Sequence, residues 1–188
     1  MKFIDHKSPE KALINTAFKS LSYMDMWISS IVEGYIYEKV DMTNKYGNRE
    51  EYTTRYGKKE GEYKMWHPNG KIKRQEYYKE GKREGEYKSW WENGQLWSQS
   101  YYNKEDNLEG EYKQWYENGQ LKYQCYHKEG KYEGEFKVWL DDGKPHSYYH
   151  YKEGKKDGEF KEWDYEGNLT KYKIYENGEV IQDLLSLE

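Results

Sequence analysis

The sequence predicts an all-β protein: an elongated repeat ribbon of tandem antiparallel β-hairpins of about 24 residues each, preceded by an N-terminal capping α-helix. Three observations predict this class. A glycine-led motif recurs five times in register, a second glycine follows each copy nine residues later, and aromatic residues make up 19% of the chain. One short unit is therefore repeated, and its buried area comes mostly from rings.

The repeated motif reads glycine, glutamate, an aromatic residue, lysine, a variable residue and tryptophan. Its copies start at Gly61, Gly85, Gly110, Gly134 and Gly158, which gives spacings of 24, 25, 24 and 24 residues. The second glycines follow Asn, Asp or Glu, at Gly70, Gly94, Gly119, Gly143 and Gly167. Asn-Gly and Asp-Gly between short aromatic runs indicate a hairpin, because both residues tolerate the positive φ of a tight reversal.

The second strand of each hairpin is predicted to begin near an apolar or ring residue: Ile72, Leu96, Leu121, Pro145 or Leu169. A Lys-Glu-Gly-Lys turn, at Gly81, Gly130 and Gly154, then leads to the next hairpin. The extra residue of the second copy falls between Asn103 and Glu109, where an insertion costs little. Because neighbouring strands lie about 4.8 Å apart, each repeat adds roughly 9–10 Å and five repeats span about 50 Å.

The N-terminal segment differs from the repeats. Ser8 and Pro9 are typical of a helix start, and apolar residues then recur at helical spacing as far as Ile31. This pattern predicts an amphipathic helix over residues 8–31 that covers the first hairpin, because the ends of a repeat sheet must be covered.

The chain is accordingly divided into four parts. The expected boundaries are residues 1–33 for the amphipathic capping helix, 34–60 for a degraded first repeat, 61–180 for five variant repeats and 181–188 for a C-terminal cap. The apolar residues expected to close this second end, or to meet a second molecule, are Val180, Ile181, Leu184, Leu185 and Leu187.

The glycine starts, the Glu-Asn-Gly turns and the aromatic-Lys-x-Trp strands resemble the shorter variant of the MORN repeat, a family of tandem β-hairpins. The resemblance covers about residues 57–180. The better-known MORN repeat has further glycines in its second half, where this chain has polar and aromatic residues. Similar variant repeats occur in bacterial antitoxin-like proteins and in proteins of large DNA viruses, which implies a role in neutralising a partner or in contacting a host.

Composition excludes several classes of function. No segment approaches the run of about 18 apolar residues that crosses a bilayer, and Asp5 stands where a secretory signal would begin its apolar run. The 31 basic and 35 acidic residues are interleaved, so no stripe follows a phosphate backbone. We therefore expect a cytoplasmic protein that binds no nucleic acid, and a membrane surface is a disfavoured partner.

No spacing of residues points to catalysis or to a metal. On an extended strand His146 and His150 would lie about 13 Å apart, too far to share a metal ion. Cys125, the one cysteine, permits no internal disulfide. It faces the same way as His127, but two ligands rarely hold a metal, and a Cys–His nucleophile needs further groups. We expect no enzyme, no cofactor and no metal site.

Two sets of rings recur once per repeat. One is the tryptophan set Trp66, Trp90, Trp115, Trp139 and Trp163; the other is Tyr63, Tyr87, Tyr112, Phe136 and Phe160. Both are expected to supply the core. The two motif positions face opposite sides of a flat strand, so either a bulge realigns them or both faces carry rings. Two aromatic faces would leave one partly exposed, and such a surface usually marks a partner site.

Glutamate and lysine alternate on the first strand of every repeat. Because they are two residues apart they share a face, and they are predicted to form a solvated charged surface. The glutamates are Glu62, Glu86, Glu111, Glu135 and Glu159, and the lysines are Lys64, Lys88, Lys113, Lys137 and Lys161.

The sequence thus predicts a non-catalytic protein–protein interaction module that binds another protein through an aromatic-rich face. The residues expected to contact the partner are Trp90, Trp115, Trp139, Tyr102 and Tyr126. Three alternatives stay open: a structural protein that forms homo-oligomers through its C-terminal residues, an antitoxin-like neutraliser of a partner protein, and a peripheral membrane-binding scaffold.

Overall fold

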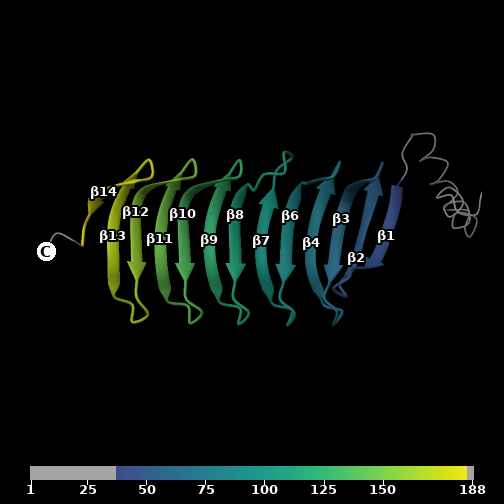
Figure 1. The fold of residues 1–188 in the computed structure, drawn as a ribbon, viewed down its shortest axis with the longest axis horizontal. Helices are drawn as coiled ribbons and strands as arrows, with labels where there is room; N and C mark the ends of the chain where they lie inside the picture. The colour runs from purple at the N-terminus through teal and green to yellow at the C-terminus, as the bar shows by residue number, and fades with distance from the viewer. Residues whose placement is uncertain (1–36, 186–188) are drawn as a thin grey trace, which may run out of the picture.

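The computed structural model describes residues 37–185, which form a single antiparallel β-sheet one layer thick (Figure 1). The sheet has 14 strands, which follow one another in chain order, except that the short β5 pairs only with β4. The strands are β1 (Tyr37–Thr43), β2 (Arg49–Arg55), β3 (Lys58–Trp66), β4 (Ile72–Lys79), β5 (Lys82–Arg83), β6 (Gly85–Trp90), β7 (Leu96–Tyr102), β8 (Gly110–Trp115), β9 (Leu121–Lys128), β10 (Lys131–Trp139), β11 (Pro145–Lys152), β12 (Lys155–Trp163), β13 (Leu169–Glu176) and β14 (Glu179–Asp183).

The all-β ribbon of hairpins is confirmed. The five glycine motifs give the hairpins β3–β4, β6–β7, β8–β9, β10–β11 and β12–β13, and their second strands begin at the five expected residues. The extra residue of the second copy lies in the connection between β7 and β8. Residues 37–55 form one more hairpin, β1–β2, before the first motif. The predicted helix over 8–31 lies outside the described residues.

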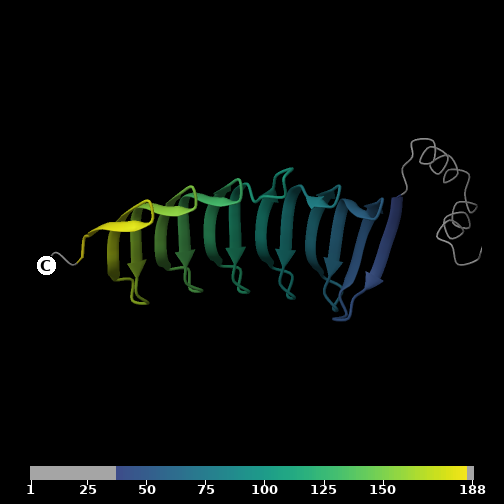
Figure 2. The same cartoon turned by 45° about the horizontal axis from the view of Figure 1, so that its top comes forward.

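The first strand of a repeat bends at its motif glycine. Gly134 has a φ of 75°, and the pairing of β10 with β9 jumps there from Tyr132 to Phe136. This is a β-bulge, which glycine favours because it adopts a positive φ without steric strain. The segments that precede the motif glycines therefore turn out of the plane of the sheet (Figure 2).

The two turns of each repeat differ in backbone conformation. In the Asn-Gly turn only the glycine has a positive φ, 82° at Gly70, and Asn69 does not share it. In the returning turn both residues do, with 52° at Glu80 and 85° at Gly81, which is the type I′ arrangement. The sequence predicts a turn with two positive φ angles at Asn-Gly. The structure has that turn at Glu-Gly instead.

The asparagine of the first turn instead joins neighbouring repeats. The Asn93 Oδ1 accepts a hydrogen bond from the Gln95 amide at 2.8 Å, and its Nδ2 donates to the Glu117 carbonyl of the next repeat at 2.9 Å. Asn69 and Asn118 make the same two bonds in their own turns. Repeat proteins gain stability from such contacts between neighbours.

One face of the sheet, here called the ring face, holds the core. It carries the third residue of each motif together with rings of the second strands. Tyr112 stacks on Tyr123 with centroids 5.5 Å apart, and Tyr123 stacks on Phe136 at 5.6 Å. Tyr63 is only 1% exposed. The expectation of a core built from rings is confirmed for Tyr63 and Phe160, which are buried, whereas Tyr87, Tyr112 and Phe136 are half-buried.

Candidate functional site

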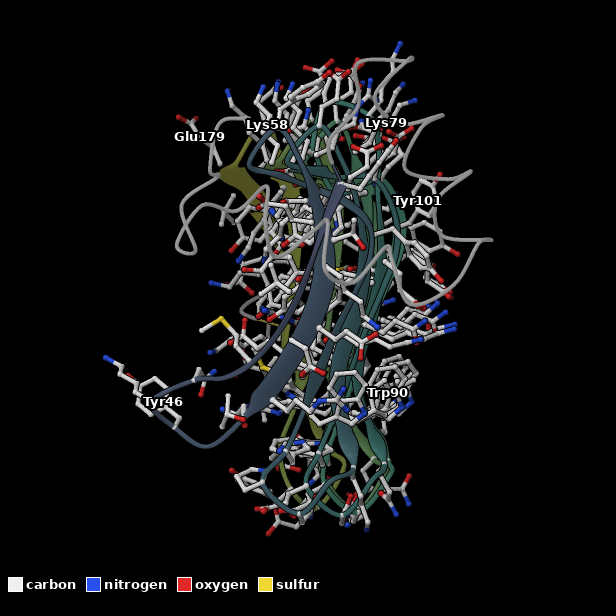
Figure 3. All side chains as sticks on the ribbon, turned by 90° about the vertical axis from the view of Figure 1, so that its right-hand side faces the viewer. Tyr46, Lys58, Lys79, Trp90, Tyr101 and Glu179 are labelled. Carbon is white, nitrogen blue, oxygen red and sulfur yellow. The ribbon has the colours of Figure 1, made fainter. Side chains whose placement is uncertain are left out.

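The opposite face, here called the tryptophan face, carries the sixth residue of each motif. The sequence left two alternatives open: a bulge that brings both sets of rings to one face, or rings on both faces. The structure shows the second. A second irregularity of pairing lies next to each tryptophan: Ser89 pairs with Ser98, but Trp90 pairs with Leu96. The extra residue is Trp97 on the second strand, so the first strand keeps its alternation and the tryptophan stays opposite the core ring. Figure 3 shows Trp90 on the same side of the sheet as Tyr101.

The tryptophans of this face form a ladder with one indole per repeat. All five are half-buried, as are Tyr87, Tyr112 and Phe136 of the ring face, so the tryptophans are packed in part against their neighbours but are not fully buried. Arg49 of β2 stacks on Trp66 at 4.7 Å from the ring centroid. No such partner from residues 37–185 lies on the rings of the other four, Trp90, Trp115, Trp139 and Trp163.

The indole N–H groups of the ladder are free donors within the described part of the chain. A tryptophan outside the ladder shows the contrast, because Trp91 Nε1 donates to the Trp115 carbonyl at 3.2 Å. An indole presents both an apolar ring and one N–H donor. Each rung of the ladder can therefore stack on a ligand and donate to it.

Rows of lysine and glutamate run beside the ladder, and the predicted sharing of a face is confirmed. Lys113 Nζ lies 2.7 Å from Glu111 Oε2, and the other four repeats form the same ion pair. Gln124 of the next strand also donates to Glu111 at 2.6 Å. In the first repeat the Lys64 hydrogen bond lowers the pKa of the Glu62 carboxyl. Because each lysine is neutralised within its own repeat, this face carries no stripe of one charge.

A row of tyrosines continues the aromatic surface over the first three repeats. Tyr101 is 50% exposed, and Tyr77 and Tyr126 are also exposed. Beside Tyr101 lies a groove of about 610 Å³, which Glu111 and Lys113 also line. It opens because β7 and β8 pair at only two positions within the strands.

Four of the five predicted contact residues lie together on the tryptophan face: Trp90, Trp115, Trp139 and Tyr126. Tyr102 does not, because it lies on the ring face beside Tyr87, and its hydroxyl accepts a hydrogen bond from Arg83 Nη1 at 2.7 Å. Its neighbour Tyr101 takes the predicted place. Because adjacent strand residues face opposite sides, the sequence placed one of these two tyrosines on each face but did not say which.

The ring face also holds a buried carboxylate. Glu76 is 2% exposed, accepts a hydrogen bond from the Tyr78 hydroxyl at 3.0 Å and lies 3.3 Å from Arg74 Nε. A cavity of about 250 Å³ lies beside it. Arg83 also lines this cavity and is paired with Asp106 at 2.7 Å. Since both guanidinium groups are paired within the chain, the cavity offers no unpaired charge.

The cysteine and the histidines have structural roles in the described residues. Cys125 is buried, and burial raises the pKa of its thiol to about 12. His127 Nδ1 lies 4.0 Å from this sulfur. His146 and His150 donate separately, to the Trp163 carbonyl at 3.3 Å and to the Asp157 carbonyl at 2.7 Å. Residues 37–185 contain no group of three metal-ligating side chains.

The fold and this surface define a β-hairpin repeat protein. Residues 59–80, 83–104 and 108–129 match the family described as the MORN repeat variant, so residues 59–129 form three tandem MORN variant repeats. The hairpins β10–β11 and β12–β13 continue the same geometry beyond the matched residues. No curated protein matches the chain.

MORN repeats generally serve as modules of protein or membrane interaction, and the family is typically not enzymatic. Among residues 37–185 there is no helix with the length and apolar character of a membrane span.

Proposed function

We propose that this protein is a non-catalytic interaction module that binds another protein along its tryptophan face. The observation that carries the proposal is the row of four partly exposed indoles, Trp90, Trp115, Trp139 and Trp163, whose N–H groups have no hydrogen-bond acceptor within residues 37–185. Tryptophan is enriched among the residues that dominate binding energy, because it buries a large rigid ring and loses little side-chain entropy. The sheet already holds these rings in place before a partner arrives.

The charge pattern supports a protein partner over a lipid surface. Adsorption to anionic lipid draws on basic residues whose charge is available to the membrane. On the tryptophan face the lysine of each repeat is paired with a glutamate, at 2.7 Å in the case of Lys88 and Glu86. Such a face attracts anionic lipid weakly, whereas neutral polar groups around aromatic rings suit a protein interface.

The test is capture of partners from native cells on the immobilised protein, compared with two variants. Trp115→Ala removes a central rung of the ladder. The matched control is Trp97→Ala, since Trp97 is 39% exposed but lies off the ladder, against Trp91 at 5.6 Å. We expect one stoichiometric protein that the wild type and the control retain and that Trp115→Ala loses. Equal retention by a folded Trp115→Ala variant would refute the proposal.

Self-association is the second candidate, and the C-terminal edge of the sheet favours it. Ile181 on β14 is 60% exposed, and Val180 and Leu185 are also exposed. An apolar edge strand is a template for pairing with another chain. Light scattering of the wild type and of Ile181→Lys tests this function: a dimer that the variant abolishes supports it, and a wild-type monomer at high concentration excludes it.

A further inference from the structure

We infer that the tryptophan face recognises a proline-rich segment in the polyproline II conformation, which lies across the strands and along the indole ladder. This inference rests on the proposed function and specifies the chemistry of the partner. Its occupant is a segment of another protein that carries little charge.

The first argument is the repeat distance of the ladder. Each repeat contributes two strands, and strands lie about 4.7–4.9 Å apart, so successive indoles recur every 9.4–9.8 Å or so along the sheet. A polyproline II helix has three residues per turn and rises about 3.1 Å per residue, so one side of it repeats about every 9.3 Å. Each turn of the ligand therefore meets one rung, and the mismatch per repeat is only a few tenths of an ångström.

Other peptide conformations fit this distance less well. An α-helix returns to the same side after seven residues, about 10.5 Å, and so drifts by about 1 Å per rung. Over the three intervals from Trp90 to Trp163 this error grows to roughly 3 Å. An extended β-strand places its same-face residues about 6.7 or 13.4 Å apart, and neither distance matches the ladder.

The second argument is hydrogen bonding. A polyproline II segment has no internal hydrogen bonds, so its carbonyl groups need donors when water is removed. The indole N–H groups of Trp90, Trp115, Trp139 and Trp163 have no acceptor within residues 37–185. Proline rings stack on aromatic side chains, and aromatic-lined grooves are the usual receptors of this conformation.

The third argument is charge. Every repeat of this face places a lysine beside a glutamate, for example Lys137 and Glu135 at 2.7 Å. A charged segment would meet both signs in alternation at each repeat, so a net charge brings it no advantage. A proline-rich segment leaves these ion pairs intact, and the lysines keep further N–H donors for its carbonyl groups.

The fourth argument is shape. The strands stand side by side in an almost straight row along the length of the molecule (Figure 1). In the view along that row the ribbons of successive repeats largely superimpose (Figure 3). Polyproline II segments are semi-rigid, so they suit a straight ladder better than a strongly twisted one.

The test uses a 12-residue oligoproline as the probe, added to the full-length protein labelled with ¹⁵N. The readout is the set of indole N–H signals in nuclear magnetic resonance spectra. We expect the ladder signals to shift while those of Trp91 and Trp97 stay in place. A 12-residue Gly-Ser peptide and an amphipathic helical peptide are the control ligands, and neither should shift the ladder.

Two variants and a shorter probe sharpen the test. We expect Trp115→Ala to weaken oligoproline binding about tenfold, as loss of a central aromatic contact does. Trp115→Leu keeps apolar volume but lacks the flat ring and the N–H, so it should weaken binding similarly if the Ala variant does not fold. A six-residue oligoproline reaches fewer rungs and should bind more weakly than the 12-residue probe.

The contrary outcomes are distinct for the two proposals. If oligoproline shifts no ladder signal at millimolar concentration, or if the helical peptide binds the ladder more tightly, the polyproline inference is refuted. The proposed function then still stands if the captured protein is lost from Trp115→Ala. If capture does not depend on Trp115, the proposed function is refuted, whatever the peptides do.

Discussion

The ammonium group of Lys59 lies 4.0 Å from the ring centroid of Tyr63, and Tyr52 and Tyr78 surround it at 4.8 Å each. A cation is attracted to the negative faces of aromatic rings. Burial in this cage lowers the pKa of Lys59. Lys156 occupies the same motif position in the last repeat, over Tyr149, Phe160 and Tyr175. The ring face thus includes a lysine cation in the first repeat and another in the last.

The first prediction reverses this charge. Lys59→Glu would direct a carboxylate at the negative ring faces, near Glu76 and Glu50, so we expect the free energy of unfolding to fall by about 2–4 kcal/mol. Urea denaturation measures this change. Lys59→Arg keeps the cation and should lose less than about 1 kcal/mol. If the glutamate variant proves as stable as the arginine variant, the cation does not stabilise the core.

The second prediction concerns the asparagine ladder of the turns. Asn93→Asp keeps the acceptor for the Gln95 amide but loses the N–H that bonds the Glu117 carbonyl. We expect a loss of about 1 kcal/mol in urea denaturation, the usual contribution of one hydrogen bond.

The fourth repeat provides the reverse experiment. Asp142 stands there in place of asparagine, and Lys144 Nζ donates instead to the Tyr165 carbonyl at 3.0 Å. Asp142→Asn restores the missing N–H and should leave stability unchanged or raise it by up to about 1 kcal/mol. A marked loss in this variant, or none in Asn93→Asp, would show that the ladder contributes little.

The third prediction concerns the type I′ turn. Glu129 has a φ of 51°, a region that asparagine adopts more readily than glutamate, and the last turn has Asn177 there with the same φ. Glu129→Asn keeps the backbone bond from its amide to the Glu109 carboxylate. We expect a gain of about 0.5–1 kcal/mol in urea denaturation. Asn177→Glu should give a loss of similar size, and the same sign for both changes would contradict the argument.

The hairpins could be predicted from the sequence because short local motifs mark them. The hairpin starts, such as Leu96, follow from turn residues that stand next to them in sequence. The position of Tyr102 did not follow, because the bulge at Trp97 shifts the alternation of β7 by one residue. Leu96 pairs with Trp90 and so lies on the same face. Strict alternation along β7 from Leu96 would therefore place Tyr102 on the tryptophan face as well. A bulge depends on how two strands pair, and no local pattern encodes it.

The fourth prediction is that Cys125 is chemically inert in the folded protein. The thiol is buried, and its pKa lies near 12, so almost no thiolate forms at pH 8. We expect a thiol reagent such as Ellman's reagent to leave the native protein unmodified and to modify one thiol per chain in urea. Rapid modification under native conditions would show that the strands around β9 open readily.

The fifth prediction is a loss of stability at alkaline pH. Burial raises the pKa of Tyr63 to about 12, and it also raises the pKa values of Tyr78 and Tyr123. Above pH 10 the unfolded chain releases these protons while the folded chain keeps them, so the free energy of unfolding falls as pH rises. Lys59 and Lys156 act in the opposite sense, because burial lowers their pKa values, but the buried tyrosines outnumber them.

Tyr63→Phe isolates one of these groups. Between pH 8 and pH 11 the wild type should lose about 1 kcal/mol more than this variant, because phenylalanine has no proton to release. At pH 8 the variant itself is less stable, since the Tyr63 hydroxyl donates to Glu50 and accepts from Arg74, both at 3.0 Å. Urea denaturation at both pH values measures the difference. Parallel pH profiles of the two proteins would mean that Tyr63 titrates normally, and that the ring face admits water at its most buried tyrosine.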